Sequence, residues 1–222
     1  LGYDTAPING SVPTANISSV TDLDVRNKNI SDLTGIEDFY ALTYLVCPDN
    51  QLTNIDVSNN PFLSGLRCSN NQLTSLDVIN NTGLTLLMCF NNQLSSLELN
   101  NNLELEYLAC GINQLTSLDL SNNSALLVFY CENNQLSSLD VRNGNNTNVD
   151  DMGSTNNPNL TCIYVDDADY SNANWPNIDP NSTFVNNEAE CALSIGDNTL
   201  ELDVFIYPSP TDDYLFIQGN KN

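Results

Sequence analysis

Five cysteines recur at an interval of 21 residues and are the first candidates for chemistry in this 222-residue chain. They are Cys47, Cys68, Cys89, Cys110 and Cys131. Regularly spaced thiols could bind a metal, carry out redox chemistry or form a series of disulfides. A zinc site needs ligands that converge tetrahedrally, and a reactive thiolate needs cationic neighbours or a helix N-terminus. The sequence contains no histidine and only 5 basic residues, which argues against these uses.

The cysteines lie within five consecutive copies of a 21-residue repeat that extends over residues 42–146. Each copy contains two short segments, LxxLxC and LxxLDV, in which apolar residues alternate with period two. This is the period of a β-strand with one buried face. One copy therefore predicts one coil with two short strands, and stacked coils predict two parallel sheets that enclose a narrow core.

The strand pattern turns the cysteine side chains into this core. Equivalent residues on neighbouring coils are separated by the strand spacing of roughly 4.8 Å, which exceeds the Cβ separation of about 3.5–4.5 Å in a disulfide. Val25 occupies the same slot one coil earlier, and Ser154 occupies it at the other end after a two-residue insertion. We therefore predict that the five cysteines are small buried hydrophobes that form a structural ladder.

The motif LxxLxCxxNQLTxLDVSxN resembles the 21-residue leucine-rich repeats of internalin J-like bacterial surface proteins, and the resemblance covers residues 20–166. It implies a leucine-rich repeat solenoid that is mainly β, with two short parallel strands per coil and little helix. It also implies that one asparagine per coil bonds neighbouring backbone in the turn after the first strand, which agrees with the turn chemistry of this residue. The matching residues are Asn50, Asn71, Asn92, Asn113 and Asn134.

The segments outside the regular copies suggest caps. Residues 1–19 are expected to be a truncated N-terminal cap, residues 20–166 the repeats, and residues 167–191 an irregular C-terminal cap. Alignment with earlier copies points Cys162 outward from the second sheet, where a returning segment that ends at Cys191 could reach it. We favour a disulfide between these two cysteines that closes the cap, with two buried free thiols as the alternative.

Residues 192–222 are expected to be a linker followed by a truncated sorting domain. The segment YPSPTDDYLFI, residues 207–217, resembles the opening of the C-terminal sorting domains of type IX secretion, whose usual motif is YPNPxxDxLxI. Ser209 replaces the usual asparagine. The resemblance implies export across an outer membrane, and the alternative is a simple terminal hairpin. Because the chain begins LGYD, without a methionine or a leader, we expect a mature or excised piece of an extracellular or outer-surface protein.

Composition excludes several classes of partner and activity. The chain carries 28 acidic and 5 basic residues, and its formal net charge of -23 repels nucleic acid and anionic lipid. No apolar run approaches the ~20 residues of a membrane span, so we predict no membrane insertion. Without histidine there is no Ser-His or Cys-His pair, and no glycine-rich phosphate loop occurs. We therefore predict a non-enzymatic monomer that needs no cofactor.

The outward residues of the second segment form an acidic file, meaning a set of equivalent residues on successive coils. It consists of Asp56, Asp77, Glu98, Asp119 and Asp140. Carboxylates at the spacing of neighbouring coils repel one another, so cations are expected nearby. Calcium, which prefers oxygen ligands, could bridge them, although no DxDxDG loop occurs. The alternative is a solvated acidic face with monovalent counterions.

The outward residues of the first segment are largely apolar and aromatic. Tyrosine, methionine, phenylalanine and arginine are enriched at the centres of interfaces. We therefore predict that this first-sheet (concave) face binds a protein or glycan ligand, through Tyr44, Val46, Arg67, Leu86, Met88, Phe90, Tyr107, Ile112, Val128, Tyr130 and Glu132. One alternative is an aromatic ladder that only stabilises the stacking of coils. Another is a structural or adhesive surface scaffold, held by calcium and without a discrete ligand pocket.

Overall fold

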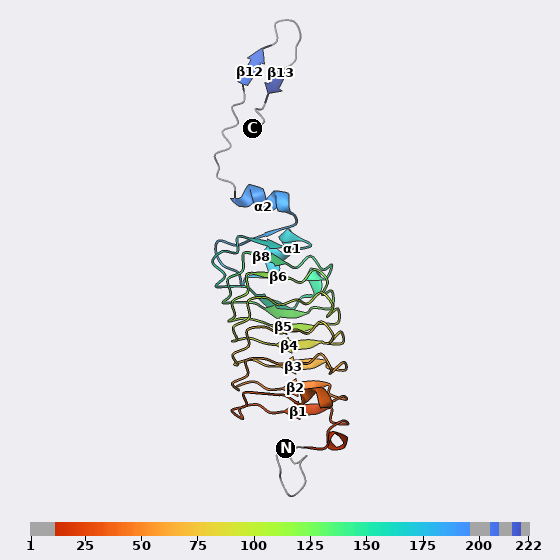
Figure 1. Cartoon of the computed structure of the whole chain (residues 1–222). Coiled ribbons are helices and arrows are strands. Elements are labelled where there is room, and N and C mark those ends of the chain that lie inside the picture. Colours follow the sequence, from red (N-terminus) through yellow and green to blue (C-terminus); the bar gives the residue numbers. More distant parts are fainter. Residues whose placement is uncertain (1–11, 196–204, 209–214, 219–222) are drawn as a thin grey trace.

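The first segment of each coil forms a strand, and these strands stack into one parallel sheet, the first sheet (Figure 1). The computed structural model describes residues 12–195 and the backbone of residues 205–208 and 215–218. The first sheet contains, in this order, β1 (Asp22–Asp24), β2 (Tyr44–Val46), β3 (Gly65–Arg67), β4 (Leu86–Met88), β5 (Tyr107–Ala109), β7 (Val128–Tyr130) and β9 (Asp151–Gly153). Leu45 of β2 pairs with Leu23 on one side and with Leu66 on the other. Sheet order therefore follows chain order, as a solenoid requires.

The second segment forms strands only in the later coils. A second parallel sheet contains, in this order, β11 (Thr183–Val185), β10 (Cys162–Tyr164), β8 (Ser138–Asp140) and β6 (Ser117–Asp119). In an earlier copy Ile55 and Val57 are buried as predicted, but their segment is not a strand. Following the stack of coils from the N-terminal end, the first described backbone hydrogen bond between the interiors of two second segments is from the Ser137 N–H to the Thr116 carbonyl, at 2.9 Å. The predicted leucine-rich repeat solenoid is confirmed. Earlier coils are bonded at the start of the second segment, as from the Gln72 N–H to the Leu52 carbonyl at 2.8 Å, and the second strand is described from β6 onward, where the bonds continue along the segment.

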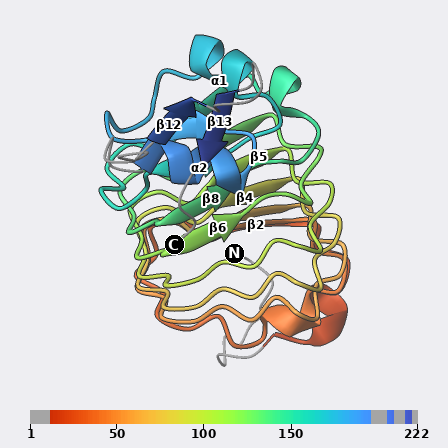
Figure 2. The same ribbon diagram turned by 90° about the horizontal axis from the view of Figure 1, so that it is seen from above.

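The core consists of files of equivalent apolar residues, one from each coil. Figure 2 views the stack end-on, with the coils superposed one behind another. One fully buried file is made of Leu42, Leu63, Leu84, Leu105 and Leu126. A second file runs through the centres of the first-sheet strands and consists of Leu45, Leu66, Leu87, Leu108 and Phe129. Because each coil packs mainly on its neighbours, the register of one coil is passed on to the next.

Two short helices and a strand cover the last coil. They are α1 (Ala168–Asn174), β11 and α2 (Glu188–Ile195). The Asp167 side chain caps α1 by accepting a hydrogen bond from the Tyr170 N–H at 3.0 Å, which makes this segment more regular than predicted. Trp175 packs edge-to-face against Phe129 and Phe184, with ring centroids 6.1 and 5.7 Å away.

A disulfide joins Cys162 of β10 to Cys191 of α2, so the predicted pairing is confirmed. It ties the second helix to the second sheet across a sequence separation of 29 residues. Val185 of β11 packs with the two cysteines in a small cluster of buried residues, and Tyr164 covers it. The pairing was accessible to sequence reasoning because the two-residue strand period turns Cys162 away from the main core.

The ends of the chain are described in part. Residues 1–11 of the predicted N-terminal cap lie outside the described residues, and three-residue 3-10 helices occur at Thr14–Asn16, Ile36–Asp38 and Asn146–Asn148. β12 (Phe205–Pro208) and β13 (Leu215–Gln218) form an antiparallel pair. Residues 209–214 of the segment that resembles a sorting domain lie outside the described residues, and that resemblance therefore stays a prediction.

Candidate ligand-binding face

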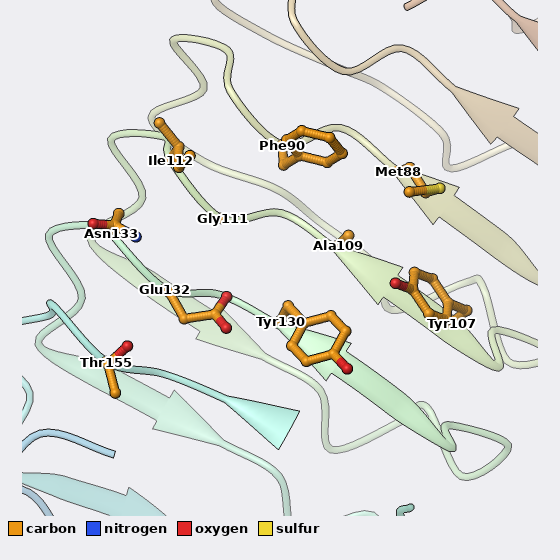
Figure 3. A pocket seen from close by; sticks show the side chains of 10 residues that line it. All are labelled: Met88, Phe90, Tyr107, Ala109, Gly111, Ile112, Tyr130, Glu132, Asn133 and Thr155. Atoms are coloured by element: carbon orange, nitrogen blue, oxygen red, sulfur yellow. The ribbon is translucent and has the colours of Figure 1, made fainter. Parts of the chain in front are cut away.

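The solvent side of the first sheet carries a hollow of about 430 Å³ over β4, β5, β7 and the turns that follow them (Figure 3). Its residues come from three successive coils and from the edge of a fourth. They are Met88, Phe90, Tyr107, Ala109, Gly111, Ile112, Tyr130, Glu132, Asn133 and Thr155. A cavity of this volume lies at the lower end of the range of small-ligand pockets. It therefore suits one side chain or one sugar ring rather than a long segment.

The hollow exists because one coil has small residues where its neighbours have large ones. In the register of the sheet, Ala109 lies between Met88 on β4 and Tyr130 on β7. Two residues further along, Gly111 occupies the repeat position of Phe90 and Glu132. Figure 3 shows the side chains of the flanking coils standing on both sides of this small-residue floor.

Two tyrosines form one wall of the hollow. The rings of Tyr107 and Tyr130 meet edge-to-face with centroids 6.1 Å apart. The Tyr130 hydroxyl donates a hydrogen bond to the Asp151 carboxylate at 2.6 Å, and this bond is the main cause that raises the pKa of Tyr130 to about 12. A ring that is packed at its edge and bonded at its hydroxyl holds a defined orientation. The wall is therefore preorganised for stacking against a ligand.

Glu132 brings a half-buried carboxylate to the hollow beside Tyr130, on the same coil (Figure 3). A Cβ atom at Gly153 would collide with this carboxylate, and a Cβ at Gly111 would lie 3.3 Å from its Oε2 atom. The two glycines thus make room for the Glu132 side chain. Burial raises its pKa, and the nearby Asp151 charge acts in the same direction. Among the described residues, no ion pair and no hydrogen bond from another residue engages this carboxylate, so it is available to a ligand.

Ile112 stands at the rim in a backbone conformation that isoleucine rarely adopts. Its φ angle is 54°, in the left-handed region, and its side chain is 50% exposed. Neighbouring coils have Asn70, Asn91 and Asn133 at the same position and with similar φ angles. Asparagine tolerates this conformation, whereas a β-branched residue is strained in it. The structure therefore holds an exposed apolar side chain beside the hollow at an energetic cost.

The hollow brings together only part of the residues that we predicted to bind a ligand. Met88, Phe90, Tyr107, Ile112, Tyr130 and Glu132 line it. Tyr44, Val46, Arg67, Leu86 and Val128 lie on the same sheet but do not line it. The Tyr44 ring covers Gly65, where any Cβ would meet it. The wider binding assignment stays a prediction.

Four lining residues were not predicted as part of the site. They are Ala109, Gly111, Asn133 and Thr155. A signal for the first two was present in the repeat, because alanine and glycine interrupt two files of larger residues. Small size at an outward position marks the floor of a cavity only when the coils on both sides carry large side chains.

The five ladder cysteines are buried without exposed surface, as predicted. Burial raises the pKa of Cys47 and of Cys89 to about 12, and it raises the pKa values of the other three thiols as well. A thiol of this kind is protonated at neutral pH and is a poor nucleophile. Val25 and Ser154 continue the file in buried positions at its two ends. The ladder is therefore a packing device.

The predicted asparagine ladder joins each coil to the next. The Asn92 Nδ2 atom donates to the carbonyls of Cys68 and Cys89 at 3.1 and 3.0 Å. Its Oδ1 atom accepts from the Leu73 N–H at 3.0 Å. The same pattern recurs at Asn71, Asn113 and Asn134, and Asn50 bonds the entering coil in a similar way. The prediction for these five residues is confirmed.

A second asparagine ladder was not predicted. It consists of Asn60, Asn81, Asn102 and Asn123, all of them fully buried. The Asn102 Nδ2 atom, for example, donates to the carbonyls of Val78 and Asn81 at 3.1 and 2.9 Å. Within the described part of the chain, the Oδ1 atoms of these four residues have no hydrogen-bond partner. The available signal was the asparagine that recurs near the end of each copy.

The acidic file mainly stabilises turns. Asp56, Asp77 and Asp119 each accept a hydrogen bond from the backbone N–H two residues later. Asp140 does the same and also pairs with Arg142 at 2.6 Å, so one basic residue does offset this file. In the described ranges no three acidic, cysteine or histidine side chains are grouped closely enough to hold a metal ion. The suggestion of calcium on this file gains no support from the geometry.

Comparison with known proteins identifies the repeat. No family model matches the chain. Over 44 residues, 20% of this chain and 5% of the relative, it is 43% identical to internalin J of Listeria monocytogenes serotype 4b (strain F2365). The solved functional domain of InlJ from Listeria monocytogenes, which includes a cysteine ladder, is 31% identical over 69% of this chain, with a TM-score of 0.58. The chain is a leucine-rich repeat solenoid similar to internalin J.

This likeness includes the buried cysteine ladder and the length of the repeat. The internalin-like chain nevertheless spans only 41% of the solved InlJ chain. A leucine-rich repeat protein of Leptospira interrogans, 17% identical over 83% of this chain and 50% of its own, has a TM-score of 0.54 and shares the fold alone. In the described residues no helix is long and apolar enough to cross a membrane.

Proposed function

We propose that this internalin-like solenoid is a secreted or surface-attached bacterial binding module that recognises a protein or glycan ligand on its first-sheet face. The observation that carries the proposal is the hollow over Ala109 and Gly111, where the repeat departs from its own pattern. Internalin-like leucine-rich repeat domains generally mediate protein binding, which supports binding as the function of this chain. The identity of the ligand is a separate matter.

The chemical character of the face supports binding over simple stacking. Within the described hydrogen bonds and ring contacts, Tyr107 and Tyr130 contact each other, yet each also lines the open hollow. Ile112, which also lines the hollow, is 50% exposed, and Tyr44, on the same sheet but outside the hollow, is 40% exposed. Residues that served only to stack coils would be covered by their neighbours. Large side chains that keep exposed surface around a hollow are typical of interface centres.

Nothing in the site favours catalysis. The sequence has no histidine, and the five thiols of the ladder are buried with raised pKa values. Glu132 is the acidic side chain of the hollow, and no nucleophile activated by a base stands beside it. The geometry supports recognition of a ligand rather than its conversion.

The experiment is a binding screen with matched variants. The purified protein is presented to a glycan array and to a panel of extracellular proteins, and hits are repeated with the double variant Tyr107→Ala and Met88→Ala. We expect this variant to lose the binding of these hits, because it removes one of the two tyrosine rings and the methionine of the preceding coil, while its thermal midpoint changes little. The control variant Asp77→Asn with Glu98→Gln changes the acidic file on the second segment. Equal binding by the wild type and the hollow variant, or loss of binding only in the control, would contradict the proposal.

A further inference from the structure

We propose that the hollow over Ala109 and Gly111 receives an arginine side chain of a partner protein, with Glu132 as the counter-charge. This inference rests on the proposed function and names the chemistry of the group that enters the hollow. It uses three features of the described structure: an uncompensated carboxylate, aromatic walls and a small-residue floor.

The first feature is charge. Glu132 is half-buried, and no described basic side chain contacts its carboxylate. The net charge of -23 adds a long-range attraction for cationic partners. Desolvation of a carboxylate without a partner is unfavourable, and a cation placed beside it offsets that cost. A basic group of the ligand would therefore supply the positive charge that Glu132 lacks.

The second feature is the aromatic lining. Phe90 stands on the coil before Gly111 and Tyr130 on the coil after it, and Tyr107 stands at the far end of the hollow on the same coil as Gly111 (Figure 3). A guanidinium group stacks on aromatic rings and is attracted to their faces within about 6 Å. The hydrogen bond from Tyr130 to Asp151 holds one of these rings in place. The same walls thus accept the flat sides of a planar cation.

The third feature is shape. Because Ala109 and Gly111 carry little or no side chain, a long side chain can descend between the flanking coils. Asn133 and Thr155 add polar groups at the end of the hollow nearest Glu132. A planar guanidinium can then present two N–H donors to the two carboxylate oxygens, which a compact ammonium ion cannot do in the same way.

A neutral sugar is the main competitor for this site. Sugar rings also stack on tyrosine and bond to carboxylates, but they supply no counter-charge to Glu132. Asn133, Thr155 and the tyrosine hydroxyls offer hydrogen bonds to a sugar as well, but a neutral sugar leaves the charge of the half-buried carboxylate uncompensated. The observed lining therefore favours a basic protein side chain, and a sugar becomes an outcome of the test.

The test is an NMR titration of the isotope-labelled protein with acetyl-glycyl-arginyl-glycine amide at about 150 mM salt, where long-range attraction is screened. We expect weak binding, on the order of millimolar, with resonance changes centred on Gly111, Ile112 and Glu132. Glu132→Gln should weaken binding about tenfold, which corresponds to the loss of a charge-assisted bond. Ala109→Leu should block binding, since it fills the floor at a position where other coils carry larger residues. The thermal midpoints of both variants verify folding.

Two controls separate the site from general acidity. The citrulline analogue of the peptide keeps the shape without the charge, and Glu98→Gln removes a carboxylate outside the hollow. Equal binding of the arginine and citrulline peptides would overturn the proposal, and so would equal weakening by Glu98→Gln and Glu132→Gln. Preferential shifts with a neutral monosaccharide would do the same and point to a glycan.

The two proposals can fail separately. If a partner found in the binding screen is captured equally well by wild type and Glu132→Gln, the face binds but the arginine assignment is wrong. The opposite outcome has two parts: the arginine peptide binds in the hollow and depends on Glu132, but no hit of the screen depends on Tyr107 and Met88. In that case the hollow does bind arginine, and the proposed function is wrong.

Discussion

Ile112 occupies a position that other coils give to asparagine or aspartate, and its φ angle of 54° explains why they do. The equivalent side chains also form an exposed amide ladder, because Asn91 Nδ2 donates to Asn70 Oδ1 at 2.8 Å and Asn70 Nδ2 donates to Asp49 Oδ1 at 2.8 Å. Ile112 interrupts this ladder directly beside the hollow. A residue that is strained, exposed and next to a cavity is in keeping with the proposed binding function of this face.

At this scale we predict that Ile112→Asn stabilises the protein by about 1 kcal/mol, because it removes the left-handed strain of a β-branched residue. The measurement is the midpoint and slope of urea unfolding. The reverse change in a coil away from the centre of the hollow, Asn70→Ile, serves as the control and should destabilise by a similar amount. A neutral or destabilising Ile112→Asn would show that the isoleucine is stabilised by packing that offsets its strain.

The two asparagine ladders differ at the scale of the element. Each residue of the first ladder uses both its donor and its acceptor, whereas each residue of the second uses only its donor. A buried acceptor without a partner costs free energy, so the net contribution of the second ladder per residue should be smaller. The coils are thus held more tightly along the turn after the first strand.

We predict that Asn92→Ala costs at least about 2 kcal/mol, because it leaves the Leu73 N–H and the carbonyls of Cys68 and Cys89 without their bonds. Asn102→Ala should cost about 1 kcal/mol less, since it also removes an unpaired oxygen. Urea unfolding of the two variants measures the difference. Equal losses would indicate that the Oδ1 atom of Asn102 is satisfied in solution.

The cysteine file also belongs to this scale, because its members share one environment. We predict that the five ladder thiols do not react with a thiol reagent in the folded protein at neutral pH, since burial both excludes the reagent and raises their pKa values. Unfolding should make all five thiols reactive at once. Reduction of the disulfide should then make the thiols of Cys162 and Cys191 reactive as well. The measurement is mass spectrometry after labelling. Stoichiometric labelling of any ladder cysteine in the folded state would refute this account of the file.

For the whole molecule, the described coils end at the C-terminal cap, and the disulfide lies there. The bond joins β10 to α2, and Arg142 adds ion pairs to Asp140 and to Glu188 of the same helix. Arg142 also stands 4.8 Å above the ring of Tyr164. Together these contacts fasten the C-terminal helix over the last coil.

We predict that the double variant Cys162→Ser and Cys191→Ser loses about 3–4 kcal/mol of stability, as expected for closing a loop of this length. The thermal midpoint should fall, and hydrogen exchange should rise first in β11 and α2 and much less in β2 to β5. An unchanged midpoint would mean that the aromatic contacts of Trp175 secure the cap without the disulfide. Wild-type protein in strong reductant should reproduce the effect of the double variant.

Much of this architecture could be predicted from the repeat. The period of two within each segment turns Leu45, Cys47, Ile55 and Val57 inward whatever their partners are, and the 21-residue interval then stacks each of them on its equivalent. The first asparagine ladder and the outward direction of Cys162 follow from the same register. These features depend on local backbone geometry that each coil repeats.

In the regular copies the sequence alone determined which residues face inward, because the period of two and the 21-residue interval set that choice even where no strand forms. Only the tertiary structure decided which outward residues line the hollow. The hollow depends on a small pair, Ala109 and Gly111, lying between large side chains of the coils before and after, and on Gly153 making room for Glu132. Such spaces arise from the sizes and orientations of side chains that are about 21 residues apart in the chain, and no local pattern encodes them.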